Sequence, residues 1–285
     1  MTYETYQAKA NAQIASELAN TASPFTIEVR FLGGLTPTQM DAFKGAADRW
    51  CKVIVGDLPG VMVDGEVIDD VLILAQGDDI DGDGGVLGQA GPTNLRPRNA
   101  GKAAFLPAKG VMTFDTADLE DMERNGTLND VIAHEMGHVL GVGKFIWGKK
   151  RLIEGCGVIP INPTFIGEAA MEEYGILVGG GPTPVPLENR GGAGTACSHW
   201  LEVIFRHELM SGFVGAAGNP LSRVTAACLQ DMGYVVDMNA AEPFALPDLQ
   251  ALARAGALAE PEGPLAKGEM LPSIPIVEPE EALTP

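Results

Sequence analysis

Apolar and polar residues recur with two different periods along the first half of the chain. Residues 25–32 (FTIEVRFL) alternate with a period of two, which indicates a strand with one buried face. Residues 70–76 (DVLILAQ) are almost continuously apolar, as in a strand at the centre of a sheet. Residues 37–53 have apolar positions at helical spacing, and the letters TPTQ at 36–39 predict a capped helix start. The pattern therefore predicts a mixture of strands and helices.

The helical period returns closer to the middle of the chain. Residues 111–114 (VMTF) predict another strand, and residues 117–124 and 131–143 have helical patterns. Asp115 and Thr127 are the expected N-caps of these two helices, because a side-chain oxygen at that position can accept from the free amides of the first turn. The order strand, helix, strands, helix is thus expected up to residue 143.

Beyond residue 143 the composition changes. Residues 144–196 are rich in Gly and Pro, and within them only residues 167–174 have a helical pattern. A further amphipathic helix is expected at residues 220–232, with Pro at its start and Gly233 after its end. A segment with so little regular structure needs an organiser, and a bound metal would supply one.

Composition and charge limit the classes of partner. The 285 residues are 46% hydrophobic and 20% charged, which is ordinary for a globular protein with one large domain or two small ones. The net charge of −19 is not ordinary. It argues against binding to nucleic acid or to an anionic membrane, and it fits simple solubility or cationic partners. No nucleic-acid partner is therefore expected.

The sequence says little about compartment. The first 20 residues have no basic start and no apolar core, so no Sec signal peptide is expected. No apolar run reaches 18 residues, so no transmembrane segment is expected either. Secretion by another route and a cytoplasmic location are both compatible, and the oligomeric state is unknown. Buried thiols and one or two disulfides are also all compatible with the four cysteines, which are Cys51, Cys156, Cys197 and Cys228.

The candidate chemistry lies in residues 131–143 (VIAHEMGHVLGVG). His134 and His138 are four residues apart, so a helix places both imidazoles on one face, where both can bind one metal ion. Glu135 lies about 100° further around the helix, close enough to act on a water at the metal without being a ligand. The alternative is a helix with two incidental histidines, although the chain has only four in all. We interpret the stretch as a site for one catalytic Zn²⁺.

A catalytic zinc needs a third protein ligand and keeps one position open. In the compact pattern HExxHxxGxxH this ligand would occupy position 144, but Lys144 stands there, and an ammonium group does not bind zinc at neutral pH. A third histidine ligand must then be His199 or His207. Gly141 stands where the pattern has its glycine, and we expect it to allow a sharp turn at the end of the helix.

Two weaker signals precede the zinc motif. In residues 77–85 (GDDIDGDGG), the carboxylates Asp79, Asp81 and Asp83 alternate as in a Ca²⁺ loop, but the Glu that closes an EF-hand loop is absent, so a solvated turn is the alternative. Residues 86–90 (VLGQA) predict a short strand that includes Gly88 and Gln89. If this strand lies at a sheet edge near the zinc, an extended peptide can pair with it.

Taken in order, three stretches resemble the leishmanolysin-type zinc metalloendopeptidases, a metzincin branch in which a long insertion separates the glycine from the third histidine. They are HEMGHVLG at 134–141, SHW at 198–200 and ELMS at 208–211, and GVMTFD at 110–115 is similar to the bacterial members. The resemblance covers roughly residues 25–237. It implies that His199 is the third zinc ligand and that Met210 is the Met-turn methionine beneath the metal, whereas His207 is structural.

The resemblance also implies an α+β, zincin-like fold, with a twisted and mostly parallel sheet, long helices and a loop-rich C-terminal subdomain across a horizontal cleft. Some metzincins place a Tyr after the Met-turn; here Phe213 occupies the nearby position, has no hydroxyl, and is a candidate for the substrate pocket. We expect four parts. The first two are an N-terminal, Ala-rich helical arm at 1–23 and an N-terminal catalytic subdomain at 24–143 that ends in the zinc helix. A C-terminal subdomain at 144–238 contains the insertion, the third ligand and the Met-turn. The last part is a Pro-, Ala- and Glu-rich tail at 239–285, in which residues 261–285 are expected to be solvated.

The expected function is that of a zinc-dependent endopeptidase. A zinc-activated water would attack the peptide bond of a peptide or protein substrate, and Glu135 would serve as general base. The alternative is a non-catalytic domain that binds a peptide or partner and holds zinc only as a structural element. The intact Glu135 argues against that alternative, because a structural metal site needs no base.

Overall fold

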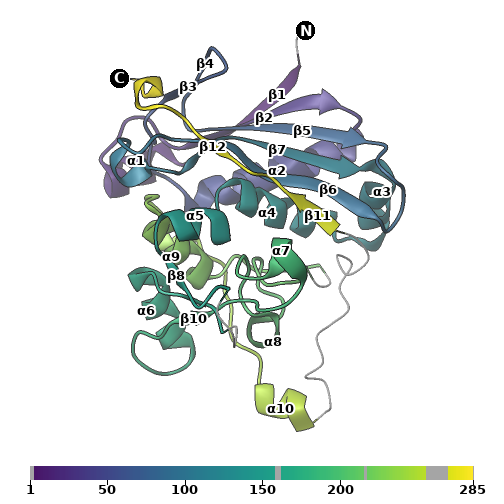
Figure 1. Ribbon diagram of the computed structural model, residues 1–285, viewed down its shortest axis with the longest axis vertical. Coiled ribbons are helices and arrows are strands. Elements are labelled where there is room, and N and C mark those ends of the chain that lie inside the picture. The colour runs from purple at the N-terminus through teal and green to yellow at the C-terminus, as the bar shows by residue number, and fades with distance from the viewer. Residues whose placement is uncertain (1–2, 158–161, 215–216, 255–268, 285) are drawn as a thin grey trace.

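Strands and helices are mixed in the computed structural model, so the fold is α+β (Figure 1). The structure describes residues 3–157, 162–214, 217–254 and 269–284. Its main sheet has the order β1-β2-β5-β7-β6, and two C-terminal strands, β11 and β12, pair with the outer edge of β6. The strands are β1 (Glu4–Lys9), β2 (Thr26–Gly33), β5 (Val71–Asp78), β6 (Val86–Leu95), β7 (Pro107–Asp115), β11 (Glu269–Pro272) and β12 (Ile276–Val277).

The centre of the sheet is parallel and its flanks are mixed. β2, β5 and β7 run parallel to one another, while β1 is antiparallel to β2 and β6 is antiparallel to β7. The period-two pattern at 25–32 forms β2, which buries Ile27, Val29 and Phe31. The apolar run at 70–76 forms β5 between two parallel neighbours, which explains why it has no polar face.

Two helices cover the face of the sheet that looks toward the C-terminal half (Figure 1). α2 (Pro37–Val53) contacts β1 and β2, and α4 (Leu128–Val139) packs between α2 and the strands β6 and β7. The capping box predicted for α2 is present, because the Thr36 hydroxyl accepts from the Gln39 amide and the Gln39 side chain accepts from the Thr36 amide. α2 and α4 thus form the layer that carries the site.

The connection between β7 and α4 differs in one detail from the sequence prediction. Asp115 caps α3 (Thr116–Asn125) as expected, since its Oδ1 accepts from the Ala117 amide at 2.8 Å. Thr127 stands at the N-cap position of α4 but does not cap it with its side chain. Its hydroxyl donates instead to Asn125 Oδ1 at 2.6 Å, which leaves the first turn of α4 to backbone contacts.

The C-terminal half consists of short elements joined by loops, and it lies below the sheet in Figure 1. A small sheet has the order β10-β9-β8, and α6 packs against α9. The elements are α5 (Lys144–Lys149), β8 (Ile153–Glu154), β9 (Thr164–Phe165), α6 (Glu168–Leu177), β10 (Val185–Pro186), α7 (Gly192–Thr195), α8 (Glu202–Phe205), α9 (Arg223–Met232) and α10 (Leu249–Arg254).

Six short elements complete the order. A hairpin of β3 (Val61–Val63) and β4 (Glu66–Ile68) lies at the end of the sheet near the C-terminus, and α1 (Ala12–Ala19) joins β1 to β2. Two 3₁₀ turns are η1 (Gly101–Ala103) and η2 (Met238–Ala240), and a third, η4 (Glu280–Ala282), follows β12. None of the helices in the described ranges is long and apolar enough to cross a bilayer.

Both ends of the chain carry more sheet structure than the sequence predicts. Residues 4–9 were expected in a helical arm, but they form β1, which pairs with β2 from Glu4 opposite Phe31 to Lys9 opposite Thr26. The described part of 261–285 was expected to be solvated, but residues 269–272 and 276–277 pair with β6 and Ala282 is buried. In both places the partner strand lies far away in sequence, so local composition could not reveal the pairing.

Candidate metal centre and cleft

The helix α4 presents two histidines one turn apart from a rigid, buried position. His134 is 1% exposed, and Val131, Ile132 and Met136 on the same helix are completely buried. The indole Nε1 of Trp50, on α2, donates to the carbonyl of Ala133 at 2.9 Å, which ties the two helices beside the first histidine. Packing on all sides therefore fixes where the imidazoles point.

A third histidine meets these two from the C-terminal half. The Nε2 atoms of His134 and His138 are 3.1 Å apart, and the Nε2 of His199 lies 3.1 Å from the first and 2.9 Å from the second. His199 is 7% exposed. Three ring nitrogens thus meet at one point, although His199 follows His138 by 61 residues.

The opposite ring nitrogens determine what that point can hold. Each Nδ1 lies within hydrogen-bond distance of a backbone carbonyl: His134 of Leu209 at 2.6 Å, His138 of Val142 at 2.7 Å, and His199 of Thr195 at 3.0 Å. A carbonyl only accepts, so each Nδ1 must carry the proton, and each neutral Nε2 then offers a lone pair. Three converging lone pairs cannot bond one another, but they suit a cation such as Zn²⁺, which binds neutral imidazole at about 2.0–2.1 Å.

Burial keeps these imidazoles in the neutral form that a metal requires. It lowers the pKa of His138 to about 3 and that of His199 to about 4, and it also lowers the pKa of His134 well below its usual value. Burial acts on Glu135 in the opposite sense and raises its pKa to about 8, because it disfavours the carboxylate. A dication bound beside Glu135 would favour the charged form and lower that pKa again.

The end of α4 places the second histidine. Gly141 has φ of 99°, a left-handed conformation that glycine adopts without strain, and it turns the chain back beneath the helix. This turn brings the carbonyl of Val142 to His138 Nδ1. A side chain at position 141 would also crowd Met232, whose Cε would lie 3.0 Å from the added Cβ. The predicted role of Gly141 as the turn at the helix end is therefore confirmed.

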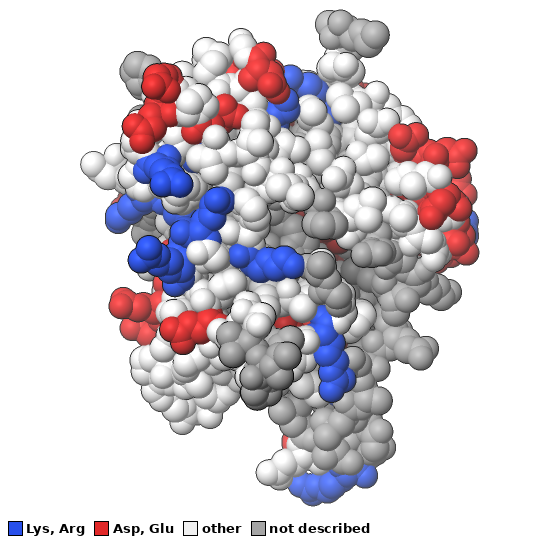
Figure 2. All heavy atoms as spheres, viewed as in Figure 1, with Lys and Arg blue, Asp and Glu red and all other residues white. Residues whose placement is uncertain are grey.

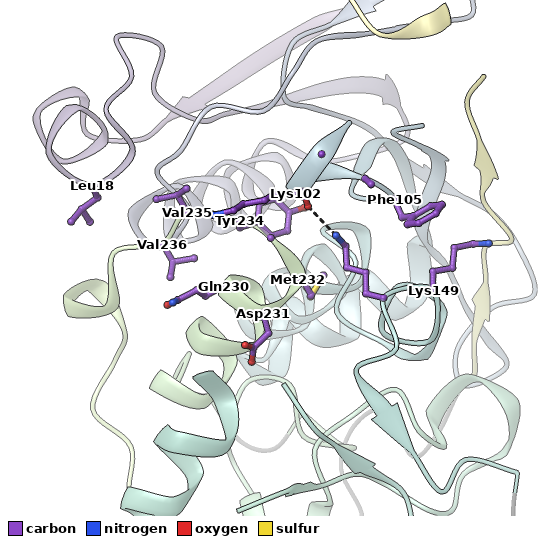
Figure 3. Close-up of a pocket in the computed structure, with 14 residues that line it drawn as sticks. Leu18, Lys102, Phe105, Lys149, Gln230, Asp231, Met232, Tyr234, Val235 and Val236 are labelled. Carbon is purple, nitrogen blue, oxygen red and sulfur yellow. Dashed lines mark hydrogen bonds between the residues drawn. The ribbon is translucent and has the colours of Figure 1, made fainter. Parts of the chain in front are cut away.

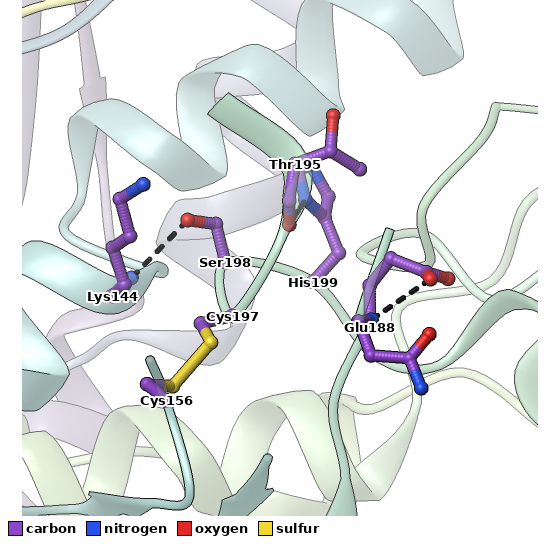
Figure 4. The surroundings of a disulfide bond; sticks show 8 residues. Lys144, Cys156, Glu188, Thr195, Cys197, Ser198 and His199 are labelled. Atoms are coloured by element: carbon purple, nitrogen blue, oxygen red, sulfur yellow. Dashed lines mark hydrogen bonds between the residues drawn. A yellow bond between two sulfur atoms is a disulfide. The ribbon is translucent and has the colours of Figure 1, made fainter. Parts of the chain in front are cut away.

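The insertion returns to the position where the compact pattern would have its third ligand (Figure 4). Lys144 begins α5, and its backbone amide lies 3.5 Å from Ser198 Oγ, next to His199. A disulfide joins Cys156 to Cys197, two residues before His199. The backbone of Glu188 adds two hydrogen bonds, since its amide donates to the His199 carbonyl and its carbonyl accepts from Cys197. The loop that carries His199 is therefore held at several points.

Met210 lies against α4 between its two histidines. A Cβ added to Gly137 would stand 2.7 Å from Met210 Sδ, so only glycine allows this contact. Met210 is fully buried, and its amide donates to Glu208 Oε2 at 2.6 Å. Met210 thus packs directly beneath the stretch from His134 to His138.

Glu208 holds the turn at Met210 in place, although the sequence indicated it only as part of the ELMS motif. Its buried carboxylate accepts from the Met210 amide, from the Ser222 amide and hydroxyl, and from Thr225 Oγ1. Thr225 Oγ1 in turn accepts from Trp200 Nε1 at 2.8 Å. One carboxylate therefore connects the turn at Met210 with the start of α9. Its place in the ELMS motif at 208–211 was the available signal.

A cavity of about 660 Å³ opens beside the three histidines and separates the sheet from the C-terminal half. Glu135, which is 3% exposed, lines it, as do Phe213 and Lys144. The strand β6 contributes Leu87 and Ala90 to the lining. This arrangement places a carboxylate and a potential cation at the same wall of a space large enough for part of a peptide.

Gly88 and Gln89, predicted for the substrate pocket or edge strand, do not line this cavity, and neither does His207, which was predicted to be structural. Gly88 and Gln89 are on β6, opposite Met270 and Leu271 of β11, and Gly88 backs onto β7, where an added Cβ would meet the Thr113 carbonyl. His207 is exposed, and its ring is tilted against that of Phe244, with the centroids 5.6 Å apart. It is not part of the histidine cluster.

The structure does not support the predicted Ca²⁺ site at Asp79, Asp81 and Asp83. Among the described residues, the groups that could hold a metal are the three histidines and an acidic group at Asp57, Asp69 and Asp70. The acidic loop is organised by amides instead: Asp115 Oδ2 accepts from the amides of residues 80, 81 and 82. The carboxylate of Asp81 accepts from the Val86 amide, so the loop has the hydrogen bonds of a turn. The alternative of a solvated turn fits these contacts.

Figure 3 shows a second cavity, of about 770 Å³, whose lining includes none of the three histidines. Its lining includes Phe105, Lys149 and Tyr234, and the Lys149 ammonium lies 5.7 Å from the centre of the Phe105 ring. Lys150 Nζ donates to the Lys102 carbonyl at 3.0 Å, and burial lowers the pKa of this ammonium to about 8. The three histidines and Glu135 line the first cavity and not this one.

Comparison with known proteins gives two matches to the same family. The family model of leishmanolysin, peptidase M8, matches residues 102–249, which is just over half of the chain. A leishmanolysin homolog from Crithidia fasciculata is 30% identical over 138 residues. That alignment covers 45% of this chain and 20% of the relative, so the chain matches about one fifth of the relative's length. The matched family region contains the whole histidine cluster and Met210.

Proposed function

This chain belongs to the leishmanolysin family of peptidases, and from that premise we propose that it is a zinc-dependent endopeptidase. His134, His138 and His199 would hold the metal, and Glu135 would act as general base. The proposal also places the chain with the metzincins as a bacterial-type member, with Met210 in the Met-turn. The substrates would be peptides or proteins, as the family name implies.

The observation that carries the proposal is the convergence of three neutral Nε2 atoms beside a buried carboxylate. Each histidine donates its Nδ1 proton to a backbone carbonyl, so the three lone pairs face one another in a water-accessible cavity. A structural metal site needs neither an open cavity nor a carboxylate base beside it, but Glu135 and the three histidines line the same cavity. The donor set, three imidazoles with one side open, is also the set that zinc hydrolases use.

The protein's own groups support hydrolysis in distinct ways. When bound, zinc supplies the Lewis acidity that polarises a carbonyl and makes water nucleophilic at neutral pH. Glu135 would take a proton from the attacking water and pass it to the leaving amine, a role supported by its position on the same helix and in the same cavity as the histidines. Its burial removes competing solvent, and the fixed imidazoles do not have to reorganise during the reaction.

The decisive test separates metal binding from turnover. We expect the zinc-loaded chain to cleave fluorescein-labelled casein, and a chelator to abolish the cleavage. Glu135→Gln should lower the rate by about 10²–10⁴-fold, the usual contribution of general acid–base catalysis, while the zinc content stays at one per chain. The matched control is Glu172→Gln, at an exposed position of α6, which should cleave like the wild type.

Two outcomes would contradict the proposal. A Glu135→Gln protein that cleaves at the wild-type rate would show that this carboxylate is not the base. A zinc-loaded wild type that cleaves neither casein nor a mixture of unstructured peptides would favour the non-catalytic alternative.

A further inference from the structure

We propose that residues 269–274 are an intramolecular occupant of the cleft, and that this segment must leave β6 before a peptide can bind beside the histidines. The inference rests on the proposed peptidase function for the identity of the competing ligand. The edge of β6 was predicted to pair with a substrate peptide. In the structure a segment of the same chain pairs with this edge.

The segment occupies the edge of β6 that an extended peptide would need. One side of β6 is paired with β7, so only the other side can accept an added strand. β11 pairs there in parallel, with Met270 opposite Gly88 and Leu271 opposite Gln89. A strand that joins a sheet edge gains main-chain hydrogen bonds, so two strands cannot use the same stretch of edge at once. Occupation by β11 therefore excludes another peptide from that stretch.

The same segment also lines the cavity at the metal centre. Met270, Leu271, Ser273 and Ile274 border the space that is lined by His134, Glu135 and His199. The Ser273 hydroxyl donates to the Pro92 carbonyl of β6 at 2.8 Å. At Gly91 an added Cβ would stand 3.1 Å from Ser273 Cβ, which shows how closely the two backbones approach.

On its other side the segment approaches the C-terminal half. A Cβ added to Gly194 of α7 would lie 3.7 Å from the Met270 carbonyl oxygen, and Figure 1 shows β11 passing between the sheet and α7. The segment thus spans the opening between the strand β6 and the helix that precedes His199. A bound peptide would have to use this same space.

The segment itself and the residues that follow it are held unequally. Downstream, the Glu278 amide donates to the Leu95 carbonyl, the Thr284 amide donates to the Gly60 carbonyl, and Ala282 is buried. Upstream, Leu271 is 43% exposed and Ile274 is 86% exposed, so of these side chains only Met270 packs against the core. A segment anchored at one end can detach from the cleft and remain tethered, which gives it a high effective concentration for rebinding.

The sequence of the segment suits an occupant better than a cleavable substrate. In MLPSIP, at 270–275, the third and sixth residues are proline. Proline has no backbone N–H and fixes φ. Two peptide bonds of the segment, those that precede its prolines, therefore have no N–H group. The anchored residues after Ile274 also prevent the chain from moving freely along the cleft.

The test compares three variants of the full chain loaded with zinc. Met270→Asp removes the apolar contact that holds the segment, and Ser273→Ala removes only its hydroxyl bond to β6, so the second variant remains informative if the first folds poorly. Ile276→Asp is the matched control, because Ile276 lies on β12, is 62% exposed and does not line the cavity. Thermal unfolding confirms that each variant is folded.

The first readout is binding, which does not depend on turnover. The probe is a fluorescein-labelled nonapeptide with the sequence of residues 269–277, followed by fluorescence anisotropy. A weaker internal contact raises the fraction of open cleft, so the affinity for the probe should rise about tenfold in Met270→Asp and about threefold in Ser273→Ala. The probe should bind Ile276→Asp as it binds the wild type, within about twofold.

The second readout is casein cleavage by the same proteins. At low substrate concentration Met270→Asp should cleave about tenfold faster through a lower KM, with kcat unchanged, and the nonapeptide should inhibit it competitively. Equal probe affinity in the wild type and both cleft variants would overturn the proposal, even if casein is cleaved normally. Tighter probe binding without any casein cleavage would support the occupant while contradicting the peptidase function.

Discussion

At the scale of single residues, the backbone decides what the three histidines can do. Each imidazole is oriented by one carbonyl, and these carbonyls belong to Leu209, Val142 and Thr195. Two of them come from the segments around His199 and Met210. The orientation of the three candidate ligands therefore depends on loops that are far from α4 in sequence, although α4 carries two of the three histidines.

His199→Ala tests the assignment of the third ligand. Loss of a group that merely orients a ligand already costs about 10–100-fold in metal affinity, so loss of the ligand itself should cost more than about 100-fold. Zinc content after dialysis against a weak chelator provides the measurement. His207→Ala is the control, since His207 is exposed and outside the cluster. Equal zinc retention in both variants would show that position 199 is not a ligand.

Gly137→Ala tests the contact between the zinc helix and Met210. An added methyl would lie 2.7 Å from the Met210 sulfur and 2.9 Å from Trp50, so neighbouring side chains must move. Overpacking of this kind costs about 1–3 kcal/mol of unfolding free energy. The control is Gly45→Ala on α2, where nothing lies within 4 Å, and which should gain about 0.5–1 kcal/mol. Urea denaturation of both variants, with zinc present, gives the two free energies; a neutral Gly137→Ala would contradict the close contact.

At the scale of elements, local signals predicted those parts whose cause is local. The capping box at Thr36 and the cap at Asp115 depend on neighbours within three residues, and both are present. The helix with His134 and His138 depends only on helical spacing. By contrast, β1 and β11 form because distant strands offer free edges, and their own sequences carry no strand pattern strong enough to show it.

The candidate site divides in the same way. The histidine pair and Glu135 follow from the spacing of one motif, but geometry could not choose between His199 and His207 before the fold was known. His199 is brought to the other two histidines by the disulfide to Cys197, the contact of Lys144 with Ser198, and the hydrogen bonds of Glu188. All of these contacts join residues 9 or more positions apart. Only the folded chain reveals such contacts; at the sequence level the resemblance to a family took their place.

The short helix α8 carries a carboxyl group that should make stability depend on pH. Burial raises the pKa of Glu202 to about 7; its Oε2 accepts from the Phe213 amide, and its buried Oε1 has no hydrogen-bond partner among the described residues. The folded state therefore holds a proton that the unfolded state releases near pH 4.5, so the free energy of unfolding falls as the pH rises from about 4.5 to about 7.

Glu202→Gln should remove this dependence, because the amide is uncharged at every pH and keeps the same shape. The variant should match the wild type near pH 5 and exceed it above pH 7 by at most about 3 kcal/mol. Urea denaturation at several pH values measures the difference, with the exposed Glu172→Gln as control. A variant that is less stable than the wild type at about pH 8 would show that the fold stabilises the Glu202 carboxylate, which contradicts a raised pKa.

At the scale of the whole molecule, charge and contacts are unevenly distributed. Although the chain has a net charge of −19, Lys and Arg side chains gather on the face shown in Figure 2, around α5, while acidic side chains lie mainly toward its margins. Between the halves, Arg49 of α2 contacts Asp130 of α4, the Asn219 carbonyl and Glu242. This guanidinium and the histidine cluster are two separate connections between the sheet half and the loop-rich half.

Zinc should therefore stabilise the two halves to different degrees. α4 is buried against α2, β6 and β7 whether or not metal is present, whereas His199 belongs to a segment with little regular structure of its own. A ligand that binds only the folded state raises the free energy of unfolding by about 4 kcal/mol when its concentration is about 1,000 times its dissociation constant. Most of that gain should appear where the metal supplies an otherwise missing contact, which is the segment from residue 188 to residue 214.

Hydrogen exchange measured by mass spectrometry, with zinc and after chelation, tests this coupling. Amides of residues 188–214 should lose far more protection on chelation than those of β5 and β7, because the central parallel strands open only in global unfolding. His199→Ala is the matched control, since zinc should no longer change its exchange pattern. If chelation instead lowered protection equally in β5 and in the His199 segment, the metal would act on global stability alone, and the C-terminal half would be folded independently of its ligand.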